Sequence, residues 1–222
     1  MSIPDNIRNL KATIPGHVEI IAVSKRKPVA DIMQAYEAGQ RIFGENRVQE
    51  LIEKQPQVPA DIKWHMIGHL QTNKVKYIAP FVEMIQSVDS LKLAVAIDRE
   101  AARIGRIISV LLQVHIADEE SKFGFSEDGL KSLFDSPAFG GLKNIRIDGL
   151  MGMATYTEDL EKIRSEFRCL REVFFSVKNA YFAGADHFTQ ISMGMSGDYA
   201  IAIEEGSTMI RVGTVIFGPR AY

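Results

Sequence analysis

The chain has 222 residues, enough for one domain with a large core or for two small domains. Apolar residues make up 46% and charged residues 24%, a globular composition that excludes disordered, collagen-like and disulfide-rich proteins. The 26 basic and 28 acidic residues leave a net charge of -2. This balance argues against nucleic acid as a partner, because affinity for a phosphate backbone comes mainly from accumulated Lys and Arg.

Cysteine content and apolar runs indicate where the protein resides. Cys169 is the one cysteine and can form no intramolecular disulfide, so we expect a reducing compartment. Asp5 and Arg8 interrupt the region where a signal peptide needs an apolar core, and no apolar run approaches a membrane span in length. We therefore expect a soluble, cytoplasmic protein with no membrane association. The apolar spacing around Cys169 predicts a helix in which this residue packs and does not act as a nucleophile.

Apolar, β-rich runs alternate with amphipathic stretches along the chain, the order that predicts a parallel sheet. After a helix at about residues 5–14, the expected strand runs are VEIIAVSK (18–25), RIFGEN (41–46), KWHMIGH (63–69), EMIQSVDS (83–90), IISVLLQVHIA (107–117), NIRIDGLMGMA (144–154), FTQISMGM (188–195) and STMIRVGTVIFG (207–218). The intervening helices are expected after Pro28, from about Arg47, from Asn73, over 91–105 and 126–134, from about Asp159 and over 197–206.

Eight βα units in roughly 200 residues predict a compact (β/α)₈ barrel. The rival architecture is a doubly wound open sheet, which often carries a glycine-rich turn after its first strand. Here that turn reads SKRKP, and neither GxGxxG nor GxxxxGK[ST] occurs in the chain. No linker or low-complexity segment divides the chain, so we interpret residues 1–222 as a single domain with an added N-terminal helix.

Lys25 is the most suggestive residue at the expected mouth, the carboxyl end of the strands where barrel active sites lie. It ends the first apolar run on the same side as Ile21 and Val23. Partial burial beside other cations makes a lysine amine a nucleophile able to form a Schiff base with an aldehyde. The alternative is a strand-end lysine that reaches solvent. Lys27 is disfavoured because it precedes Pro28 and already leaves for the helix.

The last two turns, SMGMSGD and RVGT, place glycine and a hydroxyl residue directly after an apolar run. Glycine lets backbone N–H groups approach phosphate oxygens, and Ser196 or Thr214 adds a hydroxyl donor. Either turn alone fits ordinary turn and cap chemistry, but two such turns facing a strand-end lysine favour a site for a phosphorylated aldehyde. Arg211 lies within the apolar run TMIRVG, where a cation needs a partner. It either faces a heteroaromatic ring nitrogen, which its donors would keep unprotonated, or forms a buried ion pair with an acidic residue such as Glu45.

Other polar groups fit ordinary structural roles better than chemistry. His65 and His69 lie about 13 Å apart in an extended strand, too far to share a metal ion, so we interpret them as core or mouth histidines. The acidic run at 118–121 is interpreted as a solvated loop.

With these residues in view, the sequence resembles the YggS/PROSC family of pyridoxal 5′-phosphate homeostasis proteins over nearly its whole length. The motifs that carry the resemblance are AVSKRKP, FGENRVQE, WHMIGHLQTNK, SVDS, DEESKFG, GLMGMA, SMGMS and GSTMIRVGTVIFG, in the family's order and spacing. The resemblance implies a single (β/α)₈ barrel like the N-terminal domain of alanine racemase. His69 and Arg47 stand where some members have Pro and Tyr, differences that touch the rim of the site.

The resemblance also implies a role for each site residue. Pyridoxal 5′-phosphate is joined to Lys25, Asn46 approaches its ring and Arg211 faces its pyridine nitrogen. The remaining cofactor-binding residues implied in this way belong to the last two turns, where they hold the phosphate or lie beside it: Met195, Ser196, Gly213 and Thr214.

Two functions are compatible with such a site. The first is a monomeric carrier that stores pyridoxal phosphate and delivers it to apo-enzymes, and the second is an amino-acid racemase or related enzyme that uses the same cofactor. Racemases of this kind add a C-terminal β domain, whereas this chain ends at Tyr222 just after the eighth strand, so we expect the carrier without robust turnover. A third possibility is an interaction protein whose barrel is only a scaffold.

Overall fold

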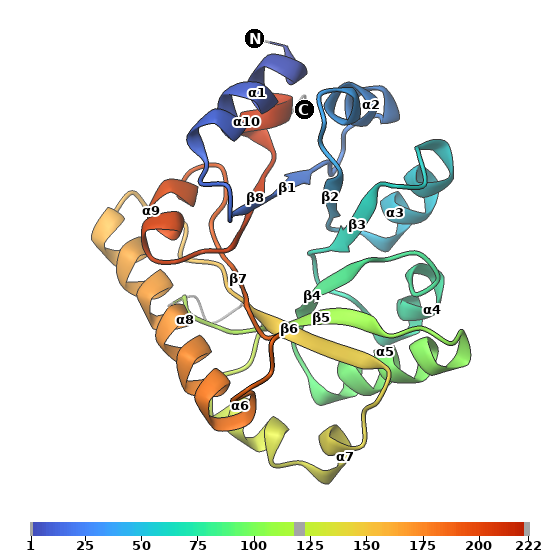
Figure 1. Ribbon diagram of the computed structural model, residues 1–222, viewed down its shortest axis with the longest axis vertical. Coiled ribbons are helices and arrows are strands. Elements are labelled where there is room, and N and C mark those ends of the chain that lie inside the picture. Colours follow the sequence, from blue (N-terminus) through green and yellow to red (C-terminus); the bar gives the residue numbers. More distant parts are fainter. Residues whose placement is uncertain (1, 118–122, 220–222) are drawn as a thin grey trace.

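The computed structural model describes residues 2–117 and 123–219. Its strands are β1 (Glu19–Val23), β2 (Ile42–Glu45), β3 (Lys63–Met66), β4 (Met84–Val88), β5 (Ile108–Gln113), β6 (Ile145–Met151), β7 (Gln190–Ser192) and β8 (Met209–Val212). They form a closed parallel barrel in which each strand pairs with its sequence neighbours and β8 returns to β1 (Figure 1). The (β/α)₈ barrel predicted from the sequence is confirmed, and the open sheet is wrong.

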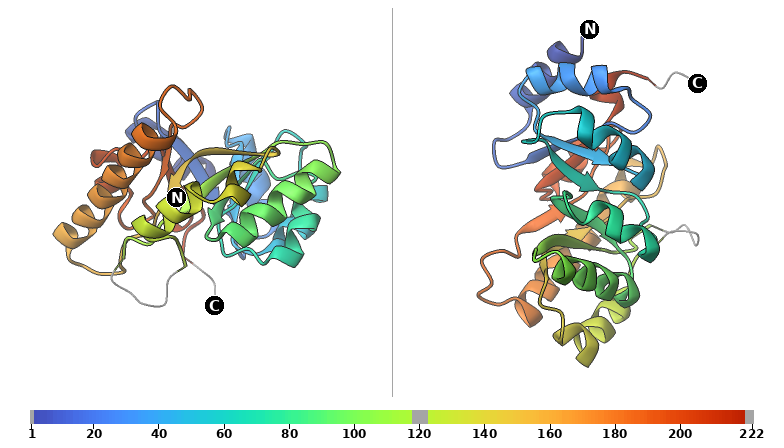
Figure 2. Two further views of the ribbon diagram at one scale, coloured as in Figure 1. Left: turned by 90° about the horizontal axis from the view of Figure 1, so that it is seen from below. Right: turned by 90° about the vertical axis from the view of Figure 1, so that its right-hand side faces the viewer.

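Helices surround this barrel on its outside (Figures 1 and 2). They are α1 (Ile3–Thr13), α2 (Val29–Glu37), α3 (Val48–Lys54), α4 (Val75–Ile78), α5 (Leu91–Arg103), α6 (Glu127–Phe134), α7 (Pro137–Gly140), α8 (Leu160–Tyr181), α9 (Tyr199–Glu204) and α10 (Thr214–Phe217), with 3₁₀ turns η1 (Gln55–Gln57) and η2 (Thr72–Lys74). The side chains of Ser90, Ser126 and Asp159 accept backbone N–H groups of the helices they precede, which explains where α5, α6 and α8 begin. Among the described residues, none of these helices combines the length and apolar character that a bilayer crossing requires.

Two sequence-based expectations differ from the structure. The helix expected from Asn73 is a 3₁₀ turn followed by the single turn of α4, which ends two residues before Pro80, because proline has no backbone N–H with which to continue the helical hydrogen bonds. The packing role expected for Cys169 is wrong, because its side chain is exposed on α8. Partial burial, together with nearby glutamates, raises the pKa of the Cys169 thiol, which disfavours the reactive thiolate.

The apolar core has two parts. A large cluster fills the space between strands and helices, and a small one lies inside the barrel, formed by Ile21, Met84, Leu111, Met151 and Met209. Side chains alternate along a strand, so residues two positions further on share the inward face. Gln86 and Arg211 therefore form a polar layer above Met84 and Met209, nearer the carboxyl ends of the strands.

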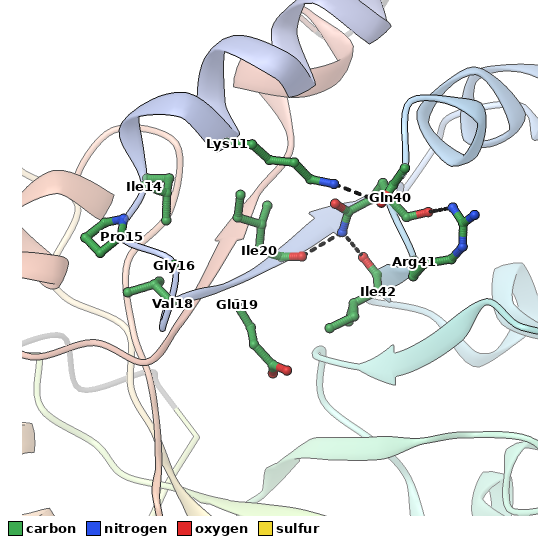
Figure 3. A pocket seen from close by; sticks show the side chains of 11 residues that line it. Lys11, Ile14, Pro15, Gly16, Val18, Glu19, Ile20, Gln40, Arg41 and Ile42 are labelled. Carbon is green, nitrogen blue, oxygen red and sulfur yellow. Dashed lines mark hydrogen bonds between the residues drawn. The ribbon is translucent and has the colours of Figure 1, made fainter.

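At the opposite end of the barrel, where the strands begin, lies the C-terminal end of α1, a helix that packs beside α10 in the outer ring (Figure 1). Nζ of Lys11 donates to the carbonyl of Gly39 at 2.8 Å, and the buried Gln40 amide donates to the carbonyls of Ile20 and Ile42 at 2.7 Å (Figure 3). A cavity of about 300 Å³ lies among these residues. It is remote from the carboxyl ends of the strands, where barrel chemistry takes place, so it plays no part in the candidate site.

Candidate functional site

Lys25 lies in a tight turn directly after β1. The N–H of Lys27 donates to the carbonyl of Ser24 at 3.0 Å, and Arg26 adopts φ 60°, a left-handed conformation uncommon outside glycine. Lys25 is half-buried, as expected for a strand-end residue at the mouth. Nζ of Lys27 donates to the carbonyl of Phe217 at 3.0 Å and is therefore committed to the end of α10.

Three charged residues, Glu45, Glu50 and Lys54, hold this turn in place, and we name them the charged cluster. Nζ of Lys54 donates to the carbonyl of Ser24 at 2.9 Å, to Oε1 of Glu45 at 2.7 Å and to Oε2 of Glu50 at 2.8 Å. The Ser24 hydroxyl donates to Oε1 of Glu45 at 2.7 Å, and the backbone N–H of Arg26 donates to Oε2 of Glu50, also at 2.7 Å. Both residues that flank Lys25 are thus bonded to the cluster.

The two carboxyl groups of the charged cluster respond differently to their surroundings. Burial raises the pKa of Glu45, and the bonds from Lys54 and Ser24 only partly oppose that effect. Burial also acts on Glu50, but the bonds from Lys54 and the Arg26 N–H bring the pKa of Glu50 below its ordinary value. Oε2 of Glu45 is buried and accepts no hydrogen bond within the described part of the chain. The cluster therefore depends on the one ammonium group that both carboxyls share.

Arg211 is held by a different kind of contact. Its Nη2 donates to the carbonyl of Gly152 at 2.9 Å, and its Nη1 donates to the hydroxyl of Ser192 at 2.6 Å. The Ser192 hydroxyl donates to Oε1 of Gln86 at 2.7 Å, and Nε2 of Gln86 lies 2.9 Å from Nδ1 of His65. We name the series Arg211–Ser192–Gln86–His65 the interior relay. It links β8, β7, β4 and β3 across the inside of the barrel.

Apart from Arg211, the interior relay is uncharged. Complete burial lowers the pKa of His65 to about 3, so its ring is neutral near pH 7. Burial also lowers the pKa of Arg211 to about 10, opposed by the charge of Asp198, and the guanidinium stays protonated. The alternative in which Arg211 pairs with Glu45 is wrong, because that carboxylate bonds Ser24 and Lys54.

The two turns predicted to hold a phosphate lie against each other. The backbone N–H of Gly213 donates to the Ser196 hydroxyl at 3.2 Å, and Thr214 follows on the exposed surface. A Cβ at position 213 would lie 3.1 Å from the carbonyl oxygen of Val23, so a side chain there would crowd the end of β1. Met195 is exposed beside Ser196. The structure thus brings these four turn residues together next to the strand that leads to Lys25.

Asn46 follows β2, and its Oδ1 is buried without a hydrogen-bond partner among the described residues. Such an atom is costly unless a ligand supplies a donor. Asn46 also borders a cavity of about 630 Å³, whose other lining residues are Arg47, Val48, Gln49, Ile52, His69, Gln71, Lys74 and Tyr77. This cavity lies beside the mouth and has no acidic lining residue.

The two histidines serve separate contacts. His65 is buried in the interior relay, whereas Nδ1 of the exposed His69 lies 2.9 Å from Oδ2 of Asp89 and its ring stacks on Phe123 at 4.0 Å between centroids. The described residues contain no group of three metal-ligating side chains of the His, Cys, Asp or Glu type. The acidic run at 118–121 lies outside the described residues.

Sequence reasoning missed Lys54, Glu50, Gln86 and Gly152. Gln86 left one signal, because it is a polar residue in the middle of a fully buried strand. Glu50 and Lys54 left none, since a Glu–Lys pair four residues apart is typical of an exposed helix face.

Residues 2–221 match the family described as alanine racemase, N-terminal domain. The pyridoxal phosphate homeostasis protein of Aquifex aeolicus is 40% identical over 205 residues, 92% of this chain and 88% of its own length. The corresponding Synechocystis protein is 38% identical over 98% of both chains.

Solved structures give the same result. PipY of Synechococcus elongatus, determined with pyridoxal phosphate (PLP) bound, has a TM-score of 0.88 at 38% identity and covers 98% of this chain and 100% of that chain. Alanine racemase of Clostridium difficile has a TM-score of 0.75 at 16% identity and matches over 56% of its own length, a likeness that shows the fold alone.

Proposed function

We propose that this chain, which belongs to the pyridoxal phosphate homeostasis proteins, binds pyridoxal 5′-phosphate and takes part in the homeostasis of that cofactor. That family is built on the alanine racemase N-terminal domain. The observation that carries the proposal is the meeting of a lysine turn, a buried arginine and two glycine-hydroxyl turns at the carboxyl ends of the adjacent strands β1, β8 and β7. Bound pyridoxal phosphate supplies an aldehyde that accepts an amine and a ring that withdraws electrons.

Lys25 is the residue proposed to hold the aldehyde. Its turn is fixed on both sides, by Ser24 and by Arg26, through the charged cluster. Lys27, the other lysine of this turn, donates to carbonyl oxygens at the end of α10 and beyond it. Because this turn is already fixed, its backbone loses little further conformational freedom when the Lys25 side chain binds a ligand, which favours attachment at this position.

The phosphate is proposed to bind at Ser196, Gly213 and Thr214, with Met195 beside it. The hydrogen bond between Gly213 and Ser196 already aligns an N–H and a hydroxyl at one point. The Ser196 hydroxyl keeps its own proton to donate to a phosphate oxygen, and the Gly213 N–H can donate by exchanging Ser196 for that oxygen. Bonds to a charged acceptor are roughly twice as strong as those to a neutral one. Much of the affinity is therefore expected to come from the phosphate.

Arg211 is proposed to face the pyridine nitrogen, and Asn46 to approach the ring. Arginine only donates, so it favours the unprotonated ring nitrogen. The unpartnered Oδ1 of Asn46 fits a ligand that brings a donor close to β2. Both features support a heteroaromatic occupant.

The attachment site is tested by borohydride reduction of the protein incubated with pyridoxal phosphate, followed by peptide mass mapping. The reduced cofactor is expected on Lys25 and absent in Lys25→Ala, with Lys27→Ala as the matched control that keeps the label. Label found on Lys27 or Lys74 would contradict the assignment. Unphosphorylated pyridoxal is expected to bind much more weakly, and Thr214→Val to weaken binding of the phosphate form without unfolding the barrel.

The physiological role proposed here is storage and delivery of the cofactor by a cytoplasmic, single-domain monomer. A lone cysteine, as in Cys169, supports a reducing compartment. Loaded protein mixed with an apo-enzyme that depends on pyridoxal phosphate is expected to restore that enzyme's activity. Racemase function predicts another result, namely α-proton exchange and D-isomer formation from L-alanine in deuterated water, both lost in Lys25→Ala.

A further inference from the structure

We propose that His65, Gln86 and Ser192 are positioning residues for Arg211, acting through the interior relay to fix the direction in which the guanidinium presents its remaining donors. The inference rests on the proposed function, because it concerns how the chain prepares Arg211 for a ring nitrogen. It adds residues on three further strands to the site.

With the Gln86 amide oriented as in the structure, the hydrogen bonds of the relay run in one direction, starting at Arg211. A guanidinium can only donate, so the Ser192 oxygen must accept from Nη1. The Ser192 proton is then given to Oε1 of Gln86, which leaves the Gln86 amide nitrogen to donate to His65. Nδ1 of His65 is therefore the acceptor, and its ring proton resides on Nε2. The neutrality of this buried histidine agrees with that role.

Neutral acceptors leave Arg211 with its full charge. A carboxylate at the position of Ser192 would neutralise the guanidinium and occupy the donors that a ligand needs. Within the described part of the chain, Arg211 forms no ion pair: its two hydrogen bonds go to a hydroxyl and a backbone carbonyl, and Asp198 acts on it through its charge without bonding to it. The relay buries four linked polar side chains inside a barrel that is otherwise filled with Ile, Leu and Met. Each member that lacked a partner would cost free energy, so such a network points to a role beyond packing.

The binding test compares Ser192→Ala with Ser87→Ala. Ser87 is a matched control: it is equally buried, follows Gln86 on β4, and donates to the carbonyl of Gly68 outside the relay. Ser192→Ala is expected to weaken pyridoxal phosphate binding by about tenfold and to shift the pH dependence of the bound cofactor's absorbance. Ser87→Ala is expected to leave the affinity and the pH dependence of the absorbance unchanged. Ser192→Thr, which keeps a hydroxyl, is expected to show the wild-type values of both quantities.

A second measurement uses the wild-type protein without cofactor. Nitrogen-15 chemical shifts are expected to show His65 protonated on Nε2 and unprotonated on Nδ1, with slowly exchanging guanidinium protons on Arg211. A proton found on Nδ1 of His65 would contradict the hydrogen-bond direction proposed for the relay. This measurement tests the proposal even if Ser192→Ala does not fold.

The outcomes separate the two proposals. If wild-type protein does not bind pyridoxal phosphate, the proposed function fails, while the nitrogen-15 spectra still test the relay. If wild-type protein binds and folded Ser192→Ala shows the same affinity and the same pH profile, the positioning role is refuted while the proposed function stands.

Discussion

Lys25 and Arg211 belong to neighbouring strands, yet the side chains that support them differ in kind. The Lys25 turn depends on the charged cluster, in which one ammonium group serves two carboxyls and a carbonyl. Arg211 depends on the interior relay, whose other members are neutral. The charged cluster holds a stretch of backbone, for which strong bonds at fixed points are sufficient. The relay supports a side chain whose own charge is needed: the groups that accept its hydrogen bonds are neutral, and Asp198 acts on it through its charge without bonding to it.

The largest expected effect comes from removing the shared ammonium of the charged cluster. Lys54→Met leaves the carboxyls of Glu45 and Glu50 without their common partner, the first fully buried. Breaking a buried ion pair by removing one member costs about 3–5 kcal/mol, so the free energy of unfolding in urea is expected to fall by that amount. A loss below about 1 kcal/mol would mean that the cluster is more hydrated than its burial indicates.

Removing the middle of the interior relay is expected to cost less. Gln86→Leu takes the acceptor from Ser192 and the donor from His65, and unsatisfied buried groups cost about 1–3 kcal/mol each. We expect a loss of about 2–3 kcal/mol in urea denaturation, against about 1 kcal/mol for the control Ser87→Ala. Equal losses in the two variants would remove the distinction between the relay and any buried hydrogen bond.

Acid is expected to act on the interior relay through His65. The pKa of this residue is lowered from 6.5 to about 3, so the unfolded chain binds a proton that the folded protein does not. The contribution of His65 to the free energy of unfolding is therefore fully present above pH 6.5 and is lost as the pH drops toward 3. Each pH unit below 6.5 costs about 1.4 kcal/mol, which gives a loss of about 2 kcal/mol at pH 5. Urea denaturation at pH 5 and 7.5 measures this slope. In His65→Gln the loss of stability between pH 7.5 and pH 5 should be smaller by about 2 kcal/mol. An unchanged loss would contradict the assignment of this pH dependence to His65.

The smallest effect is expected at an exposed ion pair. It serves as a reference for the charged cluster, because it shows how much an ion pair contributes to the free energy of unfolding when it is not buried. Lys131 and Asp128 on α6 lie 3.6 Å apart and are largely solvated. Lys131→Ala is expected to change the free energy of unfolding by less than about 0.5 kcal/mol. A larger loss would indicate that Lys131 also packs against the helix surface.

The barrel could be predicted from the sequence because each of its strands is marked by a local run of apolar residues. The short α4 could not be placed as well, since the pattern from Asn73 is helical in character while Pro80 limits it to one turn. Lys25 and the two phosphate turns were predictable because they end apolar runs. Their roles in binding remain predictions.

What could not be predicted are the partners, because they come from distant parts of the chain. Arg211 bonds residues 19 and 59 positions earlier, and Lys54 reaches a carbonyl 30 positions away. Local spacing marked Arg211 as needing a partner and offered Glu45 as one. Only the closed barrel decides which neighbours it meets.

Closure of the barrel also determines when the candidate site comes into existence during folding. Ile21 pairs with Arg211, and Asn6 on α1 donates to the carbonyl of Ile216 on α10, contacts that join segments about 200 residues apart. Contacts between such remote segments form slowly, because the intervening chain must first be ordered. On a ribosome, β1 through β7 emerge before the segment that carries Arg211, Gly213 and Thr214. The nascent chain is therefore expected to acquire affinity for its ligand in one late step, when β8 inserts between β7 and β1.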